Sequence, residues 1–172
     1  MDIETAGLAD IVRTHAMQRP DAAAIVYEGR TTTYGRLDAA ANRVGNGLIA
    51  EGIAPQTRVA HLDKSSDLFF ELLFGVAKAG AVMVSVNWRL AAPEVLHIVN
   101  DAAAEILFVG EEYFPLVEKI RSDLKTVRKV VAIGGRHPAW EAFETWRDRQ
   151  ASEDPRLPAR PQDNSLVASA GS

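Results

Sequence analysis

The sequence predicts an α/β fold in which a mostly parallel sheet is flanked by helices. Short runs rich in β-branched residues alternate with longer amphipathic runs, the order expected of parallel strands joined by crossover helices. The composition agrees with this class, because 172 residues with 47% hydrophobic and 24% charged content suffice for one domain with a substantial core.

The first part of the chain predicts a helix, a hairpin and a second helix. Apolar residues recur from Leu8 to Ala16 at three- and four-residue spacing, and Pro20 closes this helix. Residues 24–27 and 31–33 flank a Glu-Gly turn and predict a small hairpin. Thr33 or a neighbour caps the next helix, which Gly52 ends; its apolar stripe comprises Tyr34, Leu37, Ala41, Val44, Leu48 and Ile49.

The helix predicted over residues 67–79 is the most apolar in the sequence. It follows a buried strand at 58–62, and Ser65 or Ser66 is its natural cap. Its Phe, Leu and Val residues fall on nearly all sides of the helix rather than on one stripe. We therefore expect it to be covered on more than one face, and we expect the isolated chain to associate through apolar surface that later sequence would otherwise cover.

Three further strands, at residues 81–86, 106–109 and 129–133, alternate with helices at 93–101 and 113–124, which gives a sheet of four or five main strands. Trp140, Phe143 and Trp146 are three residues apart and predict the packing face of a last short helix. Residues 1–150 are therefore assigned to one α/β unit. The proline-rich range 151–172 is assigned to a linker or extended tail.

Composition and charge exclude several kinds of partner. The net charge is −4, and the basic residues are scattered, so no nucleic-acid partner is expected. The sequence has no cysteine and therefore no disulfide or thiolate site. The first residues are acidic with no apolar signal region, and no apolar run is long enough for a transmembrane segment. The expected location is cytoplasmic.

A series of short motifs resembles a known family along residues 5–134, in one order and spacing. The motifs begin at Thr33-Tyr34-Gly35-Arg36-Leu37 and Arg58-Val59-Ala60, continue through the run from Gly75 to Val82, and extend to Val86-Asn87-Trp88-Arg89-Leu90. They are similar to the amino-terminal subdomain of acyl-CoA synthetases, which are adenylate-forming, AMP-binding ligases. These residues have structural roles, so the resemblance indicates that the chain shares the scaffold of the family rather than its reactive centre.

The resemblance implies a two-step reaction for the full-length family, with ATP, Mg²⁺ and coenzyme A. The family's Ser/Thr-Gly phosphate loop would open at Ser169, Gly171 and Ser172, the only cofactor-binding residues assigned; a frayed small-residue end is the alternative. No catalytic or metal-binding residue is assigned, because the family's later acidic group, ribose-binding aspartate and carboxy-terminal lysine are missing. We expect no cofactor in the isolated chain and no turnover from it alone.

Other candidate motifs are weaker. Gly45-Asn46-Gly47 lies late in a helix and favours a close helix contact over a dinucleotide site, and the four histidines share no metal-ligand spacing. Asp63-Lys64 and Asn87-Trp88-Arg89 follow strands, where open α/β sheets bind ligands, but an ion pair and a turn residue explain them as well. The family's usual asparagine and proline are replaced here by Lys64 or Ser65 and by Ser85, which weakens the transfer of substrate contacts.

Three hypotheses remain. In the first, the chain is the amino-terminal fragment of an ATP-dependent acyl-CoA ligase, left by truncation, proteolysis or gene interruption and completed by the remainder of the enzyme. In the second, it is a non-catalytic, self-associating interaction domain. In the third, it is an unrelated flavodoxin-like nucleotide binder, although no glycine-rich turn follows a strand.

Overall fold

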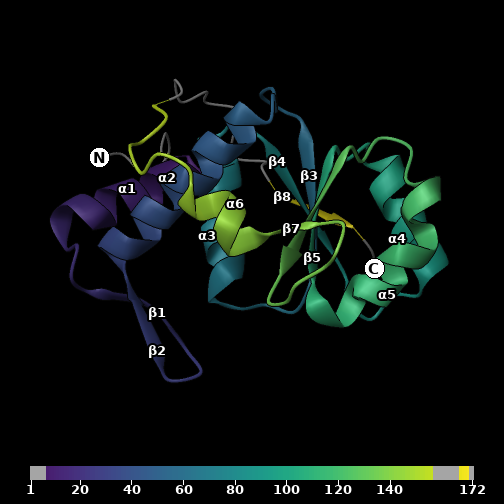
Figure 1. The fold of residues 1–172 in the computed structure, drawn as a ribbon. Coiled ribbons are helices and arrows are strands. Elements are labelled where there is room, and N and C mark those ends of the chain that lie inside the picture. Colours follow the sequence, from purple (N-terminus) through teal and green to yellow (C-terminus); the bar gives the residue numbers. More distant parts are fainter. Residues whose placement is uncertain (1–6, 157–166, 171–172) are drawn as a thin grey trace.

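The computed structural model describes residues 7–156 and 167–170, and it confirms the α/β class (Figure 1). The helices are α1 (Leu8–Gln18), α2 (Tyr34–Ala50), α3 (Asp67–Lys78), α4 (Ala92–Asp101), α5 (Phe114–Ile120) and α6 (Phe143–Asp148), with 3₁₀ turns η2 (Glu111–Tyr113) and η3 (Arg121–Asp123). The strands are β1 (Ala23–Tyr27), β2 (Arg30–Thr33), β3 (Arg58–Leu62), β4 (Val82–Val86), β5 (Ile106–Gly110), β6 (Lys129–Ile133), β7 (Glu141–Ala142) and β8 (Val167–Ala170).

The main sheet has six strands in the order β7-β6-β5-β3-β4-β8, and every pair in it is parallel. This exceeds the four or five main strands expected, because the short strands β7 and β8 occupy its two edges. β1 and β2 form a separate antiparallel hairpin, which projects away from the body (Figure 1). Since all six strands run the same way, their carboxyl ends lie at one edge of the sheet.

Helices cover both faces of the main sheet (Figure 1). On one face, α2, α3 and α6 pack against a buried layer that includes Val59, Met83 and Phe108. On the other face, α4 and α5 cover a second layer that includes Leu62 and Val86. The strand residues alternate between these layers because successive side chains point to opposite faces of a sheet. α1 lies outside α2 and α3, where Ala9 packs against Ala77.

α2 is bounded as the sequence predicts. The Thr33 hydroxyl accepts a hydrogen bond from the Arg36 backbone N–H at 3.3 Å, which confirms Thr33 as the cap. Gly52 follows the helix with a φ of 78°, a conformation that glycine adopts without strain. The close helix contact predicted for Gly45-Asn46-Gly47 is also found: a side chain at Gly45 would meet α3, and one at Gly47 would meet Trp146 of α6.

α3 is covered on more than one face, as its apolar composition predicts. Leu72 and Val76 are buried between α3 and the sheet, while α2 and α1 pack on the helix from outside. The cover includes the amino-terminal helix as well as elements that follow α3 in the chain. Part of α3 near its amino end remains accessible to solvent, because Phe70 is 38% exposed and Phe69 is only partly buried.

Two predictions of local structure were wrong. Trp140 precedes β7, so it does not share a helix with Phe143 and Trp146; it packs on the α5 side of the sheet, whereas the other two are buried on the α2 side. The single helix expected over residues 113–124 is divided into η2, α5 and η3.

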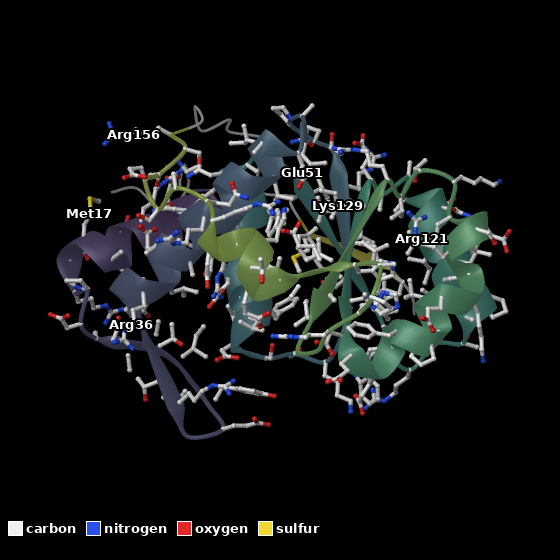
Figure 2. All side chains as sticks on the ribbon, viewed as in Figure 1. Met17, Arg36, Glu51, Arg121, Lys129 and Arg156 are labelled. Carbon is white, nitrogen blue, oxygen red and sulfur yellow. The ribbon has the colours of Figure 1, made fainter. Side chains whose placement is uncertain are left out.

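A half-buried ion pair joins the end of α2 to the sheet. Figure 2 shows the side chains of Glu51 and Lys129 close together, and the Lys129 Nζ lies 2.5 Å from the Glu51 Oε1. The same oxygen accepts a hydrogen bond from the Trp146 indole at 3.1 Å, so three elements meet at one carboxylate. Partial burial would raise the pKa of Glu51, but Lys129 and Trp146 outweigh it and hold that pKa below its ordinary value.

Candidate functional site

The carboxyl edge of the main sheet is the candidate site, because the direction of the connections changes beside β3. The chain leaves β3 for α3 on one face, whereas it leaves the neighbouring strands β4 and β5 for α4 and α5 on the other face. Such a change of direction opens a crevice outside the carboxyl ends of the strands, where open α/β sheets bind ligands. Both polar segments that the sequence placed at strand ends, Asp63-Lys64 and Asn87-Trp88-Arg89, lie at this edge.

Asp63 follows β3 directly and packs on the end of β5. Its carboxyl group lies so close to Gly110 that a Cβ there would overlap it, so this approach requires glycine. Burial raises the pKa of Asp63, against the opposing effect of a hydrogen bond from the Lys64 backbone N–H at 2.7 Å. A half-buried carboxyl of raised pKa at the carboxyl end of a parallel strand is a feature that functional sites and structural carboxyls share.

Lys64 and Arg89 place two cations around one aromatic ring. The Lys64 Nζ lies 5.3 Å from the ring centroid of Trp88, and the Arg89 Cζ lies 4.3 Å from it. Lys64 also pairs with Glu112 at 2.6 Å, so the ion pair expected of this loop forms with the segment after β5. We call Asp63, Lys64, Trp88, Arg89 and Glu112 the edge cluster.

Asn87 stabilises a turn, a structural role that asparagine favours. Its side-chain Oδ1 accepts a hydrogen bond from the Arg89 backbone N–H at 3.0 Å, which makes it a turn residue at the end of β4. The turn directs the chain from β4 to α4 and holds Arg89 over the Trp88 ring. The edge cluster therefore combines two basic side chains, two carboxyl groups and one aromatic ring, and the Asn87 turn sets the position of Arg89.

Of the residues assigned to the phosphate loop, Ser169 is the one whose backbone the structure describes. The backbone of Ser169 belongs to β8 and pairs in register with Ser85 of β4, and β8 ends beside Val86. The side chain of Ser169 and both Gly171 and Ser172 lie outside the described residues. Their assignment to a phosphate loop stays a prediction, but β8 runs to the same edge as the edge cluster.

The described residues contain no group of three or more metal-ligating side chains, and the histidines are dispersed. His61 is buried on β3 against Phe69, and His137 stacks on Trp140 at a centroid distance of 3.6 Å. Two cavities lined by described residues lie away from the edge cluster. One, of about 690 Å³, adjoins α1, α2 and residues 152–156; the other, of about 700 Å³, lies between α4 and residues 122–125.

Sequence reasoning missed an ion cluster at the far end of α3. The Lys78 side chain is 0% exposed, and its Nζ lies 2.9 Å from carboxylate oxygens of both Asp38 and Asp154. Arg13 of α1 holds the same Asp154 through Nε at 2.5 Å and Nη2 at 2.9 Å. A lysine at a core-facing position of an apolar helix is the one signal in the sequence that could have indicated it, because a buried lysine requires a partner.

A family model described as AMP-binding enzyme matches residues 12–168, which is most of the chain. The chain belongs to this family. The resemblance found in its scaffold motifs is thereby confirmed, and the flavodoxin-like alternative loses its support. No helix in the described ranges combines the length and apolar character needed to cross a membrane.

Several relatives of this member of the AMP-binding enzyme family are ligases. It is 42% identical over 142 residues to a fatty acid–[acyl-carrier-protein] ligase, ScoC, of Streptomyces coeruleorubidus, covering 83% of this chain and 26% of that protein. It is 35% identical over 136 residues to a 3-hydroxybenzoate/4-hydroxybenzoate–CoA ligase of Thauera aromatica, covering 78% and 26% respectively. The chain thus spans about a quarter of the length of these relatives.

Solved structures show the same architecture. The N-terminal domain of FACL13 from Mycobacterium tuberculosis superposes with a TM-score of 0.84 at 31% identity, covering 94% of this chain and 41% of that one. The anthranilate CoA ligase AuaEII, solved with anthranoyl-AMP, gives a TM-score of 0.86 at 29% identity, covering 96% and 32%. The fold is therefore that of the amino-terminal part of adenylate-forming ligases.

Proposed function

We propose that this chain is the amino-terminal part of an ATP-dependent acyl-CoA ligase and is inactive without the remainder. In the proposed reaction of the whole enzyme, a carboxylate oxygen attacks the α-phosphorus of ATP, giving an acyl-adenylate and releasing pyrophosphate. The thiol of coenzyme A then attacks the acyl carbon and displaces AMP, with loss of the thiol proton to solvent or a base. Fatty acids are the substrate class favoured, given the likeness to a fatty acid ligase.

The parallel pairing of β8 with β4 is the observation that carries this proposal. It directs the backbone of Ser169 toward the carboxyl edge, beside the turn formed by Asn87 and Arg89. A phosphate loop that opens at Ser169, Gly171 and Ser172 would present backbone N–H groups to a triphosphate at this edge. The register of β8 with β4 supports a loop at this edge, and residues beyond this chain would supply its remainder.

The described residues do not fit Mg²⁺. They contain no cluster of three candidate ligands, and the carboxylates at the edge are engaged elsewhere: Asp63 packs on Gly110, and Glu112 pairs with Lys64. We therefore propose that the metal ligands of the whole enzyme lie outside the described residues, and we derive no step through the metal. The proposed location is the cytoplasm, where ATP and coenzyme A are both available.

Pyrophosphate release tests the proposal in two arms. The 172-residue chain, given ATP, Mg²⁺ and a panel of fatty acids, should release no pyrophosphate above the rate without protein. A chimera in which this chain replaces the matching part of the Streptomyces fatty acid ligase should release it. Turnover by the chain alone would contradict the proposed inactivity. A folded chimera that binds ATP but gives no turnover would contradict the proposed role as a competent amino-terminal part.

A second candidate function is a self-associating interaction domain, as homo-oligomer or in complex with the remainder of the enzyme. It is favoured by the apolar side chains exposed near the hairpin and α3, where Val26 is 70% exposed and Phe70 is 38% exposed. The hairpin is joined to the start of α3 by an ion pair between Arg30 and Asp67 at 3.1 Å. We call the side chains of Val26, Leu68, Phe69, Phe70 and Leu73 the hairpin–α3 surface.

A further inference from the structure

Residues 151–156 run past α1 and α2 (Figure 1), and a series of hydrogen bonds binds them to α2. The Asn46 amide donates to the carbonyls of Ala151 and Glu153 at 2.9 and 2.8 Å. The Asn42 amide donates to the carbonyl of Ser152 at 2.9 Å. Asn42 and Asn46 are one helical turn apart, so both face the same side of α2 and together hold three successive carbonyl groups.

Asp154 fixes this segment to the core. Its carboxylate accepts hydrogen bonds from Arg13 of α1 and from Lys78 of α3, while the following Pro155 ring lies against Gly45 of α2. Two helices, α1 and α3, therefore meet at one carboxylate, and the next residue contacts α2. Partial burial would raise the pKa of Asp154, but the hydrogen bonds from Arg13 and Lys78 outweigh it and hold that pKa far below its usual range.

Lys78 makes this attachment stronger than an exposed ion pair. Its side chain is 0% exposed and the side chain of Asp154 is 20% exposed, so solvent screens the pair little. Asp38 is the other partner of Lys78. Removal of Asp154 would leave a buried ammonium group with one carboxylate instead of two, a costly state for a desolvated charge.

The position of Lys78 in the fold determines the end of the main sheet near which residues 151–156 are held. Lys78 is the last residue of α3, and β4 begins at Val82, so the ion cluster lies by the amino end of β4. β8 must enter at that same end to run parallel to β4, and its first residue, Val167, pairs with Met83. Figure 2 shows Arg156, at the end of the tethered segment, on the side of α1 and α2.

We propose that Asp154, held by Lys78 and Arg13, is a positioning residue for β8 and thereby for the residues that follow it. The segment 151–156 is then an integral part of the α/β unit, and it fixes the point from which the chain reaches β8. We call the attachment of residues 151–156 through Asp154 the tether, and it does not depend on the proposed ligase function. The relevance of the tether to catalysis rests on that function, because the position of Ser169 affects catalysis only if the phosphate loop begins at this residue.

The upper limit of the loop-closure effect follows from the number of residues between the attached segment and β8. With residues 151–156 attached, residues 157–166 connect them to β8; if loss of Asp154 releases the whole segment from Asn42 and Asn46 as well, the connection extends back to the end of α6 at Asp148. Loop-closure entropy alone makes the longer connection about twofold less favourable for pairing β8. Loss of the fixed entry point adds to this, so we expect about a two- to tenfold change in the opening of β8.

Site-resolved amide hydrogen exchange of the 172-residue chain tests the proposal. Asp154→Ala should increase the exchange rates of the β8 amides by about two- to tenfold, while the amides of β3 and β5 change less. Asp154→Asn, which keeps the side-chain shape, should give a smaller effect and guards against failure of the alanine variant to fold. Glu153→Ala is the matched control, because its exposed carboxylate takes no part in the ion cluster.

Two results would overturn the proposal. One is unchanged exchange in β8 in both Asp154 variants. The other is an increase shared equally by β3, β5 and β8, which would make Asp154 a contributor to global stability alone. Neither result depends on nucleotide or turnover, so a failure of the proposed ligase function and a failure of the tether are read from separate experiments.

Discussion

His61 is a titratable side chain inside an apolar layer. It is 3% exposed on β3, where the ring of Phe69 meets it edge-on at a centroid distance of 5.3 Å. In register it lies between Ser85 of β4 and Phe108 of β5. Burial lowers the pKa of His61 to about 4, because the surrounding layer cannot solvate an imidazolium. The ring is therefore neutral at physiological pH.

This burial predicts a loss of stability in mild acid. Between pH 6.5 and pH 4 the unfolded chain takes up a proton at His61 that the folded chain does not, so stability falls as pH falls through this window. From pH 7 to pH 5 we expect a loss of about 2 kcal/mol from this residue, measured by urea denaturation.

The variant His61→Leu should lose that part of the pH dependence. The exposed His97→Gln is the matched control and should keep it. Groups such as Glu71, whose pKa burial raises despite Arg147, titrate in both proteins and cancel in the comparison. Equal pH dependence in wild type and His61→Leu would show that His61 is solvated in the folded state.

At the scale of elements, the close packing of α2 against α3 and α6 depends on glycine residues in α2. A Cβ at Gly47 would lie 2.7 and 2.8 Å from two ring atoms of Trp146, closer than carbon atoms can approach. Trp146 is fully buried and its indole is held by Glu51, so the ring has little freedom to move. The glycine is thus required by the neighbouring helix rather than by its own backbone.

Gly47→Ala should therefore destabilise the protein, although alanine is the better helix former. Overpacking costs about 1–3 kcal/mol, and the gain in helix propensity returns about 1 kcal/mol, so a net loss of up to about 2 kcal/mol is expected in thermal or urea unfolding. In a Trp146→Phe background, where the overlapping ring atoms are absent, the same substitution should cost less. An equal cost in both backgrounds would show that the overlap is relieved elsewhere.

The elements were predictable where their periodicity is strong and not where short edge strands decide the structure. The helix over residues 67–79 and the strand at 58–62 carry clear patterns, and both are found. The three-residue spacing of Trp140 and Phe143 suited one helix, but β7 intervenes and sends the two rings to opposite faces. β8 pairs over four residues after a proline-rich run, too short a signal to stand out.

The location of the candidate site was predictable from the sequence, but the side-chain contacts were not. Strand order alone puts Asp63 and Asn87 at one edge, because parallel strands end together. The partners of Lys64 and Lys78 lie far away in the chain: Glu112 follows β5, and Asp154 is 76 residues from Lys78. No local pattern encodes contacts of that range; only the folded arrangement brings them together.

At the scale of the whole molecule, the exposed large apolar side chains of the described residues are Ile11 and Met17 on α1, Val26 on β1, Ile49 on α2 and Phe70 on α3. The hairpin–α3 surface combines Val26 with the open side of α3, and the hairpin that carries Val26 projects from the body (Figure 1). Burial of exposed apolar side chains removes them from water and so favours association. The chain spans about a quarter of the length of its relatives, and the two occupants we propose for this surface are the remainder of the enzyme and a second copy of this chain.

The double variant Val26→Ser/Phe70→Ser tests that surface in the isolated chain. If two copies associate through it, wild type should show a concentration-dependent dimer in sedimentation velocity, and the variant should weaken dimerisation by about tenfold or more, because two partly exposed apolar side chains lose their burial. Met17→Ser is the matched control: Met17 is 78% exposed but lies on α1 (Figure 2). A monomeric wild type would contradict self-association and leave the remainder of the enzyme as the occupant; equal weakening by Met17→Ser would place the interface on α1 instead.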